Sequence, residues 1–170
     1  LFFVGNNPDP NESTAFQLWK TDATEAGTVL VKQVGHSFYS PHMQRFTASG
    51  ELLFFVADDG DHGIELWRSD GTAEGTFLVK DILPGLDTSD PYWLTDANGV
   101  LYFSAYDGDH GIELWRSDGT PEGTRLVKDI WPGPVSSHPS DLYQAQGRLF
   151  FYASDGDSGL ELWTSDGTES

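Results

Sequence analysis

A segment of fourteen residues occurs twice in this chain without a single change. The sequence DGDHGIELWRSDGT occupies residues 59–72 and returns at residues 107–120. A weaker copy, DGDSGLELWTSDGT, occupies residues 155–168, and a degraded copy, FQLWKTDAT, occupies residues 16–24. The central tryptophans of the four copies are spaced by 48 residues (Trp19, Trp67, Trp115 and Trp163). A fixed period of this length is typical of a repeat architecture.

Each 48-residue unit contains four short segments that are expected to form strands. In the unit with the clearest pattern they span residues 90–97, 100–105, 112–117 and 125–130. The second segment, VLYFSA, is apolar on both faces, which is typical of a strand that is covered on both sides. Asn98-Gly99 precedes it and favours a tight hairpin, because both positions tolerate positive φ. No segment requires a helix.

The number of strands per repeat predicts the fold class. Four strands of about five to eight residues in a period of about 40 to 50 residues are typical of one propeller blade. The sequence therefore predicts an all-β fold, a β-propeller built from four-stranded antiparallel blades of 48 residues. An immunoglobulin-like sandwich does not predict this self-similarity, and a parallel β-helix would have a shorter period of about 20 to 30 residues.

The repeat divides the chain into two complete and two incomplete blades of one repeat domain, residues 1–170. The expected units are residues 1–39 (partial), 40–87, 88–135 and 136–170 (partial). A propeller ring needs about four to eight blades. We therefore expect a partial ring, a segment of a longer propeller, whose neighbouring blades come from a longer chain or from another copy.

Acidic residues far outnumber basic residues. The chain has 27 Asp and Glu against 9 Lys and Arg, and its formal net charge is -18 at pH 7. This charge repels phosphate backbones and anionic membrane surfaces, so neither nucleic acid nor a membrane is an expected partner. No apolar run is long enough to span a bilayer. The chain has no cysteine, which excludes disulfides and thiolate chemistry.

The strings ELWRSDGTAEGT and ELWRSDGTPEGT, at residues 65–76 and 113–124, resemble the ELWxxDGT repeat family. This family occurs as tandem copies in large bacterial surface or secreted proteins. The resemblance covers essentially the whole chain and implies a propeller-like protein in an extracellular or cell-surface setting, without a defined enzymatic activity. The first unit departs from the pattern, because Gln17 replaces the motif Glu and Ala23 replaces the Gly.

An acidic turn that recurs in three units is a candidate calcium site. Its carboxylates are those of Asp59, Asp61 and Glu65, of Asp107, Asp109 and Glu113, and of Asp155, Asp157 and Glu161. Calcium takes six to eight oxygen ligands, commonly from carboxylates and carbonyls of a sharply turning loop. The alternative, which we favour, is that Asp and Gly serve only to shape a hairpin turn.

The Ser-Asp-Gly-Thr segment that follows each central strand is expected to be structural. Asp70 and Thr72 can bond to backbone groups of the turn, as can their copies at residues 118, 120, 166 and 168. A phosphate-binding loop would need a lysine and a following helix, and the sequence shows neither at this segment.

Two tryptophans break the repeat and are candidate ligand-binding residues. Trp93 stands where other units have Arg45 or Asp141, and Trp131 stands where the preceding unit has Leu83. Loops on a rigid scaffold often carry binding residues, and an exposed aromatic beside carboxylates suits a neutral sugar. The alternative is that both side chains fill local gaps. The four repeated tryptophans are expected to pack between blades instead.

No catalytic constellation is visible in the sequence. No serine lies in a GxSxG motif. The five histidines do not follow the HExxH pattern; they are His36, His42, His62, His110 and His138. The sequence therefore predicts a non-enzymatic extracellular module for binding or adhesion, with a glycan or a surface protein as ligand and with calcium support as an open question. The alternatives are a structural array in a filament or surface layer and a catalytic propeller, a hydrolase or lyase.

Overall fold

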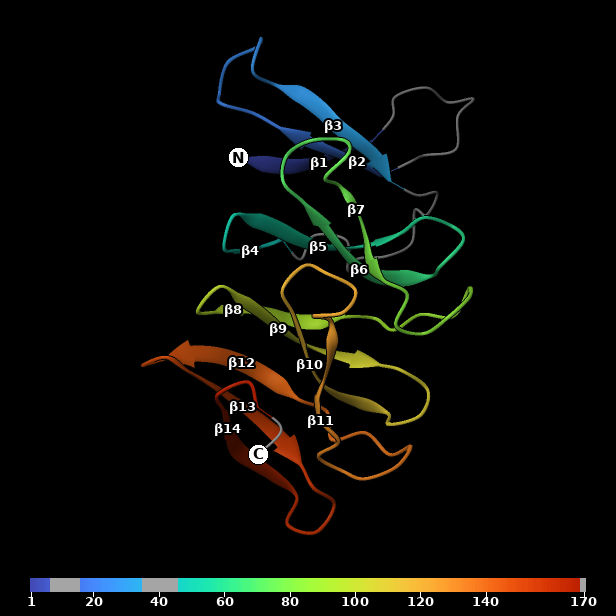
Figure 1. Cartoon of the computed structure of the whole chain (residues 1–170), viewed down its shortest axis with the longest axis vertical. Helices are drawn as coiled ribbons and strands as arrows, with labels where there is room; N and C mark the ends of the chain where they lie inside the picture. The colour runs from blue at the N-terminus through green and yellow to red at the C-terminus, as the bar shows by residue number, and fades with distance from the viewer. Residues whose placement is uncertain (7–15, 35–45, 169–170) are drawn as a thin grey trace.

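The computed structural model describes residues 1–6, 16–34 and 46–168, and all regular elements in these ranges are β-strands (Figure 1). The strands form four antiparallel sheets, in the orders β1-β2-β3, β4-β5-β6-β7, β8-β9-β10-β11 and β12-β13-β14. The predicted all-β fold of repeated small sheets is confirmed. The described residues do not form a closed ring, and they contain no helix long and apolar enough to cross a membrane.

The strand bounds follow the repeat. The first sheet contains β1 (Phe2–Asn6), β2 (Phe16–Lys20) and β3 (Val29–Val34). The second contains β4 (Thr47–Ser49), β5 (Leu52–Asp58), β6 (Ile64–Ser69) and β7 (Phe77–Lys80). The third contains β8 (Tyr92–Ala97), β9 (Val100–Tyr106), β10 (Ile112–Ser117) and β11 (Arg125–Lys128). The fourth contains β12 (Ser140–Ala145), β13 (Arg148–Ser154) and β14 (Leu160–Ser165).

The predicted strand positions agree with these bounds. Strand β10 has the bounds expected from the sequence, whereas β8 begins later and β11 ends earlier than expected. Asn98 and Gly99 form the tight turn between β8 and β9, with φ values of 59° and 80°. Positive φ at both positions is what the sequence predicted for this hairpin.

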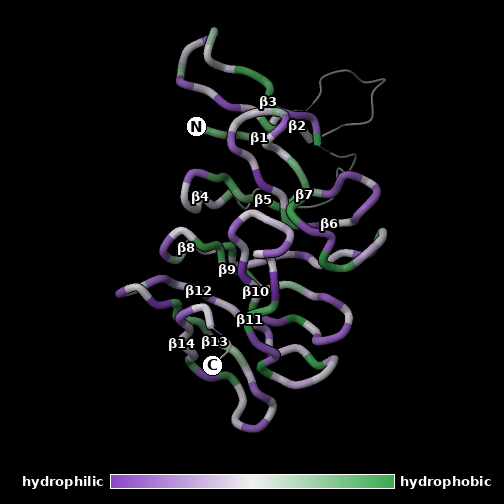
Figure 2. The backbone as a smooth tube through the Cα atoms, viewed as in Figure 1, coloured by the Kyte–Doolittle hydropathy of each residue, from purple (hydrophilic) through white to green (hydrophobic). Residues whose placement is uncertain are grey.

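The sheets stack in chain order along the long axis of the molecule (Figure 1), and many of the strand residues are hydrophobic (Figure 2). Buried apolar side chains form three clusters in the stack. Trp67 packs with Leu18 between the first and second sheets. Trp115 packs with Leu66 between the second and third sheets. Trp163 packs with the cluster between the third and fourth sheets. These three repeated tryptophans therefore pack between sheets, as expected.

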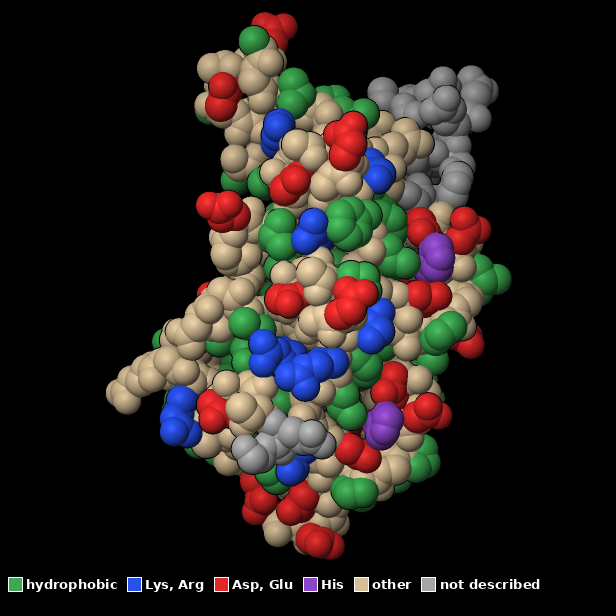
Figure 3. Space-filling model, in the orientation of Figure 1, with side chains coloured by type: hydrophobic (Ala, Val, Ile, Leu, Met, Phe, Trp, Pro, Cys, Tyr) green, Lys and Arg blue, Asp and Glu red, His purple; other side chains and the backbone are tan. Residues whose placement is uncertain are grey.

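Cations connect each sheet to a turn of the next. Arg68 Nη1 donates to the Gly119 carbonyl at 3.0 Å, and the same contact recurs 48 residues away, from Arg116 to Gly167 at 2.9 Å. Lys20 contacts Gly71 in the first unit in the same manner, at 2.7 Å. Lys and Arg side chains accordingly run down the middle of the face in Figure 3, between acidic side chains. We call these three contacts the inter-sheet latches.

Candidate functional site

A hollow of about 410 Å³ lies between the third and fourth sheets. Tyr92 and Trp93, at the start of β8, contribute to one wall together with Tyr106, at the end of β9. His138 and Leu160 contribute from the loop before β12 and from the start of β14. The hollow is thus formed where inter-sheet loops meet the ends of strands, and we call it the Trp93 hollow.

A bulge in β8 sets the position of Trp93. The pairing of β8 with β9 shifts register between Tyr92 and Thr95. Trp93 has a φ of 57°, a left-handed conformation that is unusual for a bulky side chain. Bulges of this kind re-aim a side chain, and Trp93 remains 38% exposed as a residue. Its ring meets the Tyr92 ring edge-on, with centroids 5.3 Å apart.

Two equivalent loop residues border the hollow. Asp90 and His138 occupy the same repeat position and have φ values of 42° and 52°. Their backbone amides donate to the carbonyls of Ile64 and Ile112, each at 3.2 Å. The left-handed backbone of both residues is therefore held by hydrogen bonds to the preceding sheet.

A buried carboxylate fixes the first of these loops. Glu65 is 0% exposed. Its Oε2 accepts from the Ser89 hydroxyl at 2.5 Å, and its Oε1 accepts from the Ser89 amide at 3.1 Å. The amides of Ile82 and Leu83 donate to the same carboxylate, both at 3.3 Å. Burial raises the pKa of Glu65 to about 7, against these hydrogen bonds, which favour the anion.

The same arrangement recurs in the next unit. Glu113 is fully buried and accepts from the Ser137 hydroxyl at 2.5 Å, from the Ser137 amide at 2.9 Å and from the Ile130 amide at 3.1 Å. Burial also raises the pKa of Glu113. We call these two arrangements the Glu–Ser clamps. They explain the Glu of the repeated motif, since each clamp fastens an inter-sheet loop to the core.

The acidic turns serve turn geometry in this structure. Asp59 Oδ1 accepts from the amides of Asp61 and His62, both at 3.0 Å, and Oδ2 lies 2.8 Å from His62 Nδ1. Partial burial tends to raise the pKa of Asp59, but these hydrogen bonds outweigh it, so the pKa is lowered. The bond to Asp59 raises the pKa of His62.

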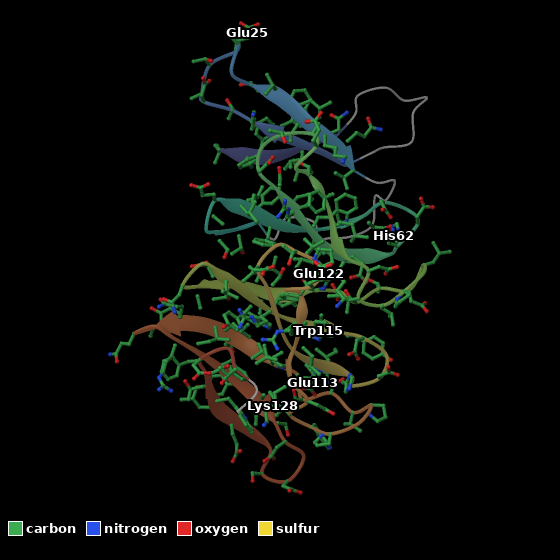
Figure 4. All side chains as sticks on the ribbon, in the orientation of Figure 1. Glu25, His62, Glu113, Trp115, Glu122 and Lys128 are labelled. Carbon is green, nitrogen blue, oxygen red and sulfur yellow. The ribbon has the colours of Figure 1, made fainter. Side chains whose placement is uncertain are left out.

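The predicted calcium ligands do not converge. Asp107 repeats the Asp59 contacts with Asp109 and His110, and Asp155 bonds the amide of Asp157. Glu65 and Glu113 belong to the clamps, and Glu161 is exposed on β14. Figure 4 shows His62 at the edge of the molecule and Glu113 among the stacked sheets. Nowhere in the described ranges do three or more Asp, Glu or His side chains lie close enough to hold a metal ion, so these residues do not fit calcium as arranged.

Trp131 lies away from the Trp93 hollow, in the loop after β11. A Cβ placed on Gly156 would lie 2.5 Å from its ring, so the indole covers the acidic turn of the fourth sheet. Leu83, at the equivalent position, lies in the same way beside Gly108. This placement supports packing as the role of Trp131. Arg45, which is equivalent to Trp93, and the histidines His36 and His42 lie outside the described residues.

Sequence reasoning missed Tyr92, Tyr106 and the clamp serines. One signal was available, because Tyr106 stands where neighbouring units have Asp58 and Ser154 and so breaks the repeat as Trp93 does. The pairing of Glu65 with a serine 24 residues further on gave no such signal, since it depends on the path of the intervening loop.

In comparisons with known proteins, no family model and no curated protein matches this chain.

Proposed function

We propose that this chain is part of a non-enzymatic extracellular β-propeller that binds a glycan, and that the Trp93 hollow is its binding site. One observation carries the proposal: a tryptophan that breaks the repeat is held in a left-handed bulge and lines a concave site beside two tyrosines. Strained backbone conformations of non-glycine residues cluster at functional sites, where the surrounding structure maintains them.

Composition and the repeat also support this proposal. The net charge of -18 leaves neutral ligands as favourable partners. The resemblance to the ELWxxDGT repeats is the support for an extracellular setting and for blades beyond those described. The proposal does not invoke calcium at this site, because the residues that border the hollow are held by hydrogen bonds to the preceding sheet.

Retention of the protein on immobilised neutral and acidic polysaccharides tests the proposal with two matched variants. Trp93→Ala should reduce retention at least tenfold and leave the thermal midpoint within a few degrees, since this indole is partly exposed. Trp131→Ala should keep retention but lower stability by about 1–3 kcal/mol, because it removes packing over Gly156.

Other outcomes support the alternatives. Unchanged retention in Trp93→Ala would contradict the assigned site. Failure of the native protein to bind any polysaccharide would favour a protein ligand or a structural array, and ordered assemblies that neither substitution disturbs would identify the array. Loss of retention after EDTA treatment would favour the hypothesis that calcium supports binding, although the acidic turns do not form a cluster of three or more carboxylates in the described residues.

A further inference from the structure

We infer that the Trp93 hollow takes a neutral saccharide. This inference rests on the proposed function and names the ligand class of the same site. The alternatives for a glycan-binding surface are an acidic saccharide, which needs counter-charges, and a broad polymer surface, which needs a flat platform. The shape, the aromatic side chains and the charge of the hollow each favour a neutral saccharide over these two alternatives.

The shape of the hollow favours a small ligand. Its volume of about 410 Å³ lies in the range of roughly 300–1,000 Å³ that is typical of small-molecule sites. A specific protein partner would instead cover roughly 800 Å² on each side. The hollow therefore fits a short stretch of an oligosaccharide better than a flat protein epitope.

The aromatic side chains of the hollow suit sugar rings. Tyr92, Trp93 and Tyr106 are 41%, 38% and 38% exposed, so each offers ring surface to a ligand. The rings of Tyr92 and Trp93 are inclined by 72° to each other. A pyranose has apolar C–H faces and hydroxyl edges, and two rings at this angle offer surfaces to two sides of it.

The polar groups of the hollow suit hydroxyl groups. Asp90, His138 and Ser140 line it beside the aromatic rings. The His138 ring and the Ser140 hydroxyl can each donate and accept hydrogen bonds, as a sugar hydroxyl does. A few polar groups within a mainly apolar and aromatic lining are typical of sites that fix the orientation of a small ligand.

The charge of the hollow argues against acidic sugars. No Lys or Arg is among its lining residues in the described part of the chain. Carboxylate, sulfate and phosphate groups are usually recognised by Arg or Lys side chains. The net charge of -18 would also repel them. Neutral saccharides do not incur this repulsion.

The Glu–Ser clamps hold the hollow in shape before a ligand binds. Ser89, held by Glu65, accepts through its carbonyl from the Tyr106 amide at 2.9 Å. Ser137, held by Glu113, directly precedes His138. The backbones of Tyr106 and His138 are therefore fastened close to buried carboxylates. A site that is ordered in advance loses less conformational entropy on binding.

Calorimetric titration with tetrasaccharides tests this inference. The neutral probes are cellotetraose, maltotetraose and mannotetraose, and the acidic probe of equal length is tetragalacturonic acid. The variants are Trp93→Asp and Tyr106→Ala. Asp is the native residue at the equivalent position 141, where φ is 52°, so Trp93→Asp should keep the fold. The control is Tyr143→Ala, which removes an exposed tyrosine outside the hollow.

We expect at least one neutral probe to bind and tetragalacturonic acid to bind at least tenfold more weakly. Trp93→Asp and Tyr106→Ala should each weaken binding of the neutral probe at least tenfold. Tyr143→Ala should bind as the native protein does. Equal affinity for the acidic probe would overturn the neutral class while leaving glycan binding in place. Retention on acidic polysaccharides but not on neutral ones would also overturn the neutral class. Equal weakening by Tyr143→Ala would overturn the site, and no saccharide binding in either experiment would overturn the proposed function itself.

Discussion

The position of the motif glutamate, which is Gln in the first unit, has three different surroundings in one molecule. Glu65 and Glu113 are fully buried and receive hydrogen bonds from serine and backbone donors of an inter-sheet loop. Glu161 has the same place in its strand but is exposed. Gln17, the residue at this position in the first unit, is buried and accepts from the indole N–H of Trp19 at 3.1 Å. The inter-sheet loops that donate to Glu65 and Glu113 therefore decide what these two side chains do.

The buried carboxylate of Glu65 predicts a pH-dependent stability. Its folded pKa of about 7 lies above the ordinary value of 4.5. The folded state therefore holds the proton more tightly, and the stabilisation from protonation is fully present below pH 4.5 and lost as pH rises through about 7. Glu65→Gln removes this titration, so the melting temperature of the native protein minus that of the variant should fall from pH 5 to pH 8. The pKa shift from 4.5 to about 7 corresponds to a change in the free energy of unfolding on the order of 3 kcal/mol.

Thermal melts of both proteins across this pH range measure the effect, and Glu161→Gln is the control. It makes the same chemical change at the exposed copy of the position, so its difference from the native protein should stay constant with pH. Parallel pH profiles for the native protein and Glu65→Gln would show that the Glu65 carboxylate titrates as it does in the unfolded chain.

At the scale of elements, the turn after each central strand is built almost entirely from its own side chains. Asp118 Oδ1 accepts from the Thr120 amide at 2.9 Å and from its hydroxyl at 2.7 Å. The Thr120 hydroxyl accepts from the Gly123 amide at 2.9 Å, and the Thr124 hydroxyl donates to the Thr120 carbonyl at 2.7 Å. A side chain on Gly123 would collide with the Asp118 carboxylate. These local bonds explain why the DGTxxGT spacing repeats.

Removal of the central acceptor should loosen this turn. Asp118→Ala deletes both bonds from Thr120 and should destabilise the protein by about 1 kcal/mol, or roughly 2–4 °C in the thermal midpoint for a chain of this size. Glu122→Ala, at an exposed position of the same loop, is the control and should change stability by less than about 0.5 kcal/mol. Equal effects of the two substitutions would mean that the turn does not depend on Asp118.

At the scale of the whole molecule, the sheets are held together by packed tryptophans and by the inter-sheet latches. The Arg68 guanidinium lies 4.4 Å from the centre of the Phe77 ring and donates to the Gly119 carbonyl of the next unit. Because Arg68 joins groups 51 residues apart, it couples two sheets that share no strand. Lys20, Arg68 and Arg116 therefore serve cohesion between units.

The latch from Arg68 should contribute measurably to stability. Arg68→Met keeps an apolar stem over Phe77 but removes the bond to Gly119, and should cost about 1–3 kcal/mol in the free energy of unfolding, measured by urea denaturation. Arg125→Met removes an exposed cation of the third sheet and serves as the control for the change in net charge. If both variants unfold at the same urea concentration, the loss reflects charge alone and the latch contributes nothing.

The sequence by itself determined the repeat, the all-β class and the positions of most strands. These follow from local signals: β10 and the Asn98-Gly99 turn are specified by apolar runs and by residues that tolerate positive φ. Only the tertiary structure decided where individual side chains lie and what they contact. Trp93 and Trp131 both break the repeat, yet one lines a hollow and the other covers Gly156. Glu65 enters the core although its turn resembles a calcium loop. These outcomes depend on which loop of which sheet covers each residue, and contacts between units are set by the stacking of sheets rather than by the order of residues within one unit.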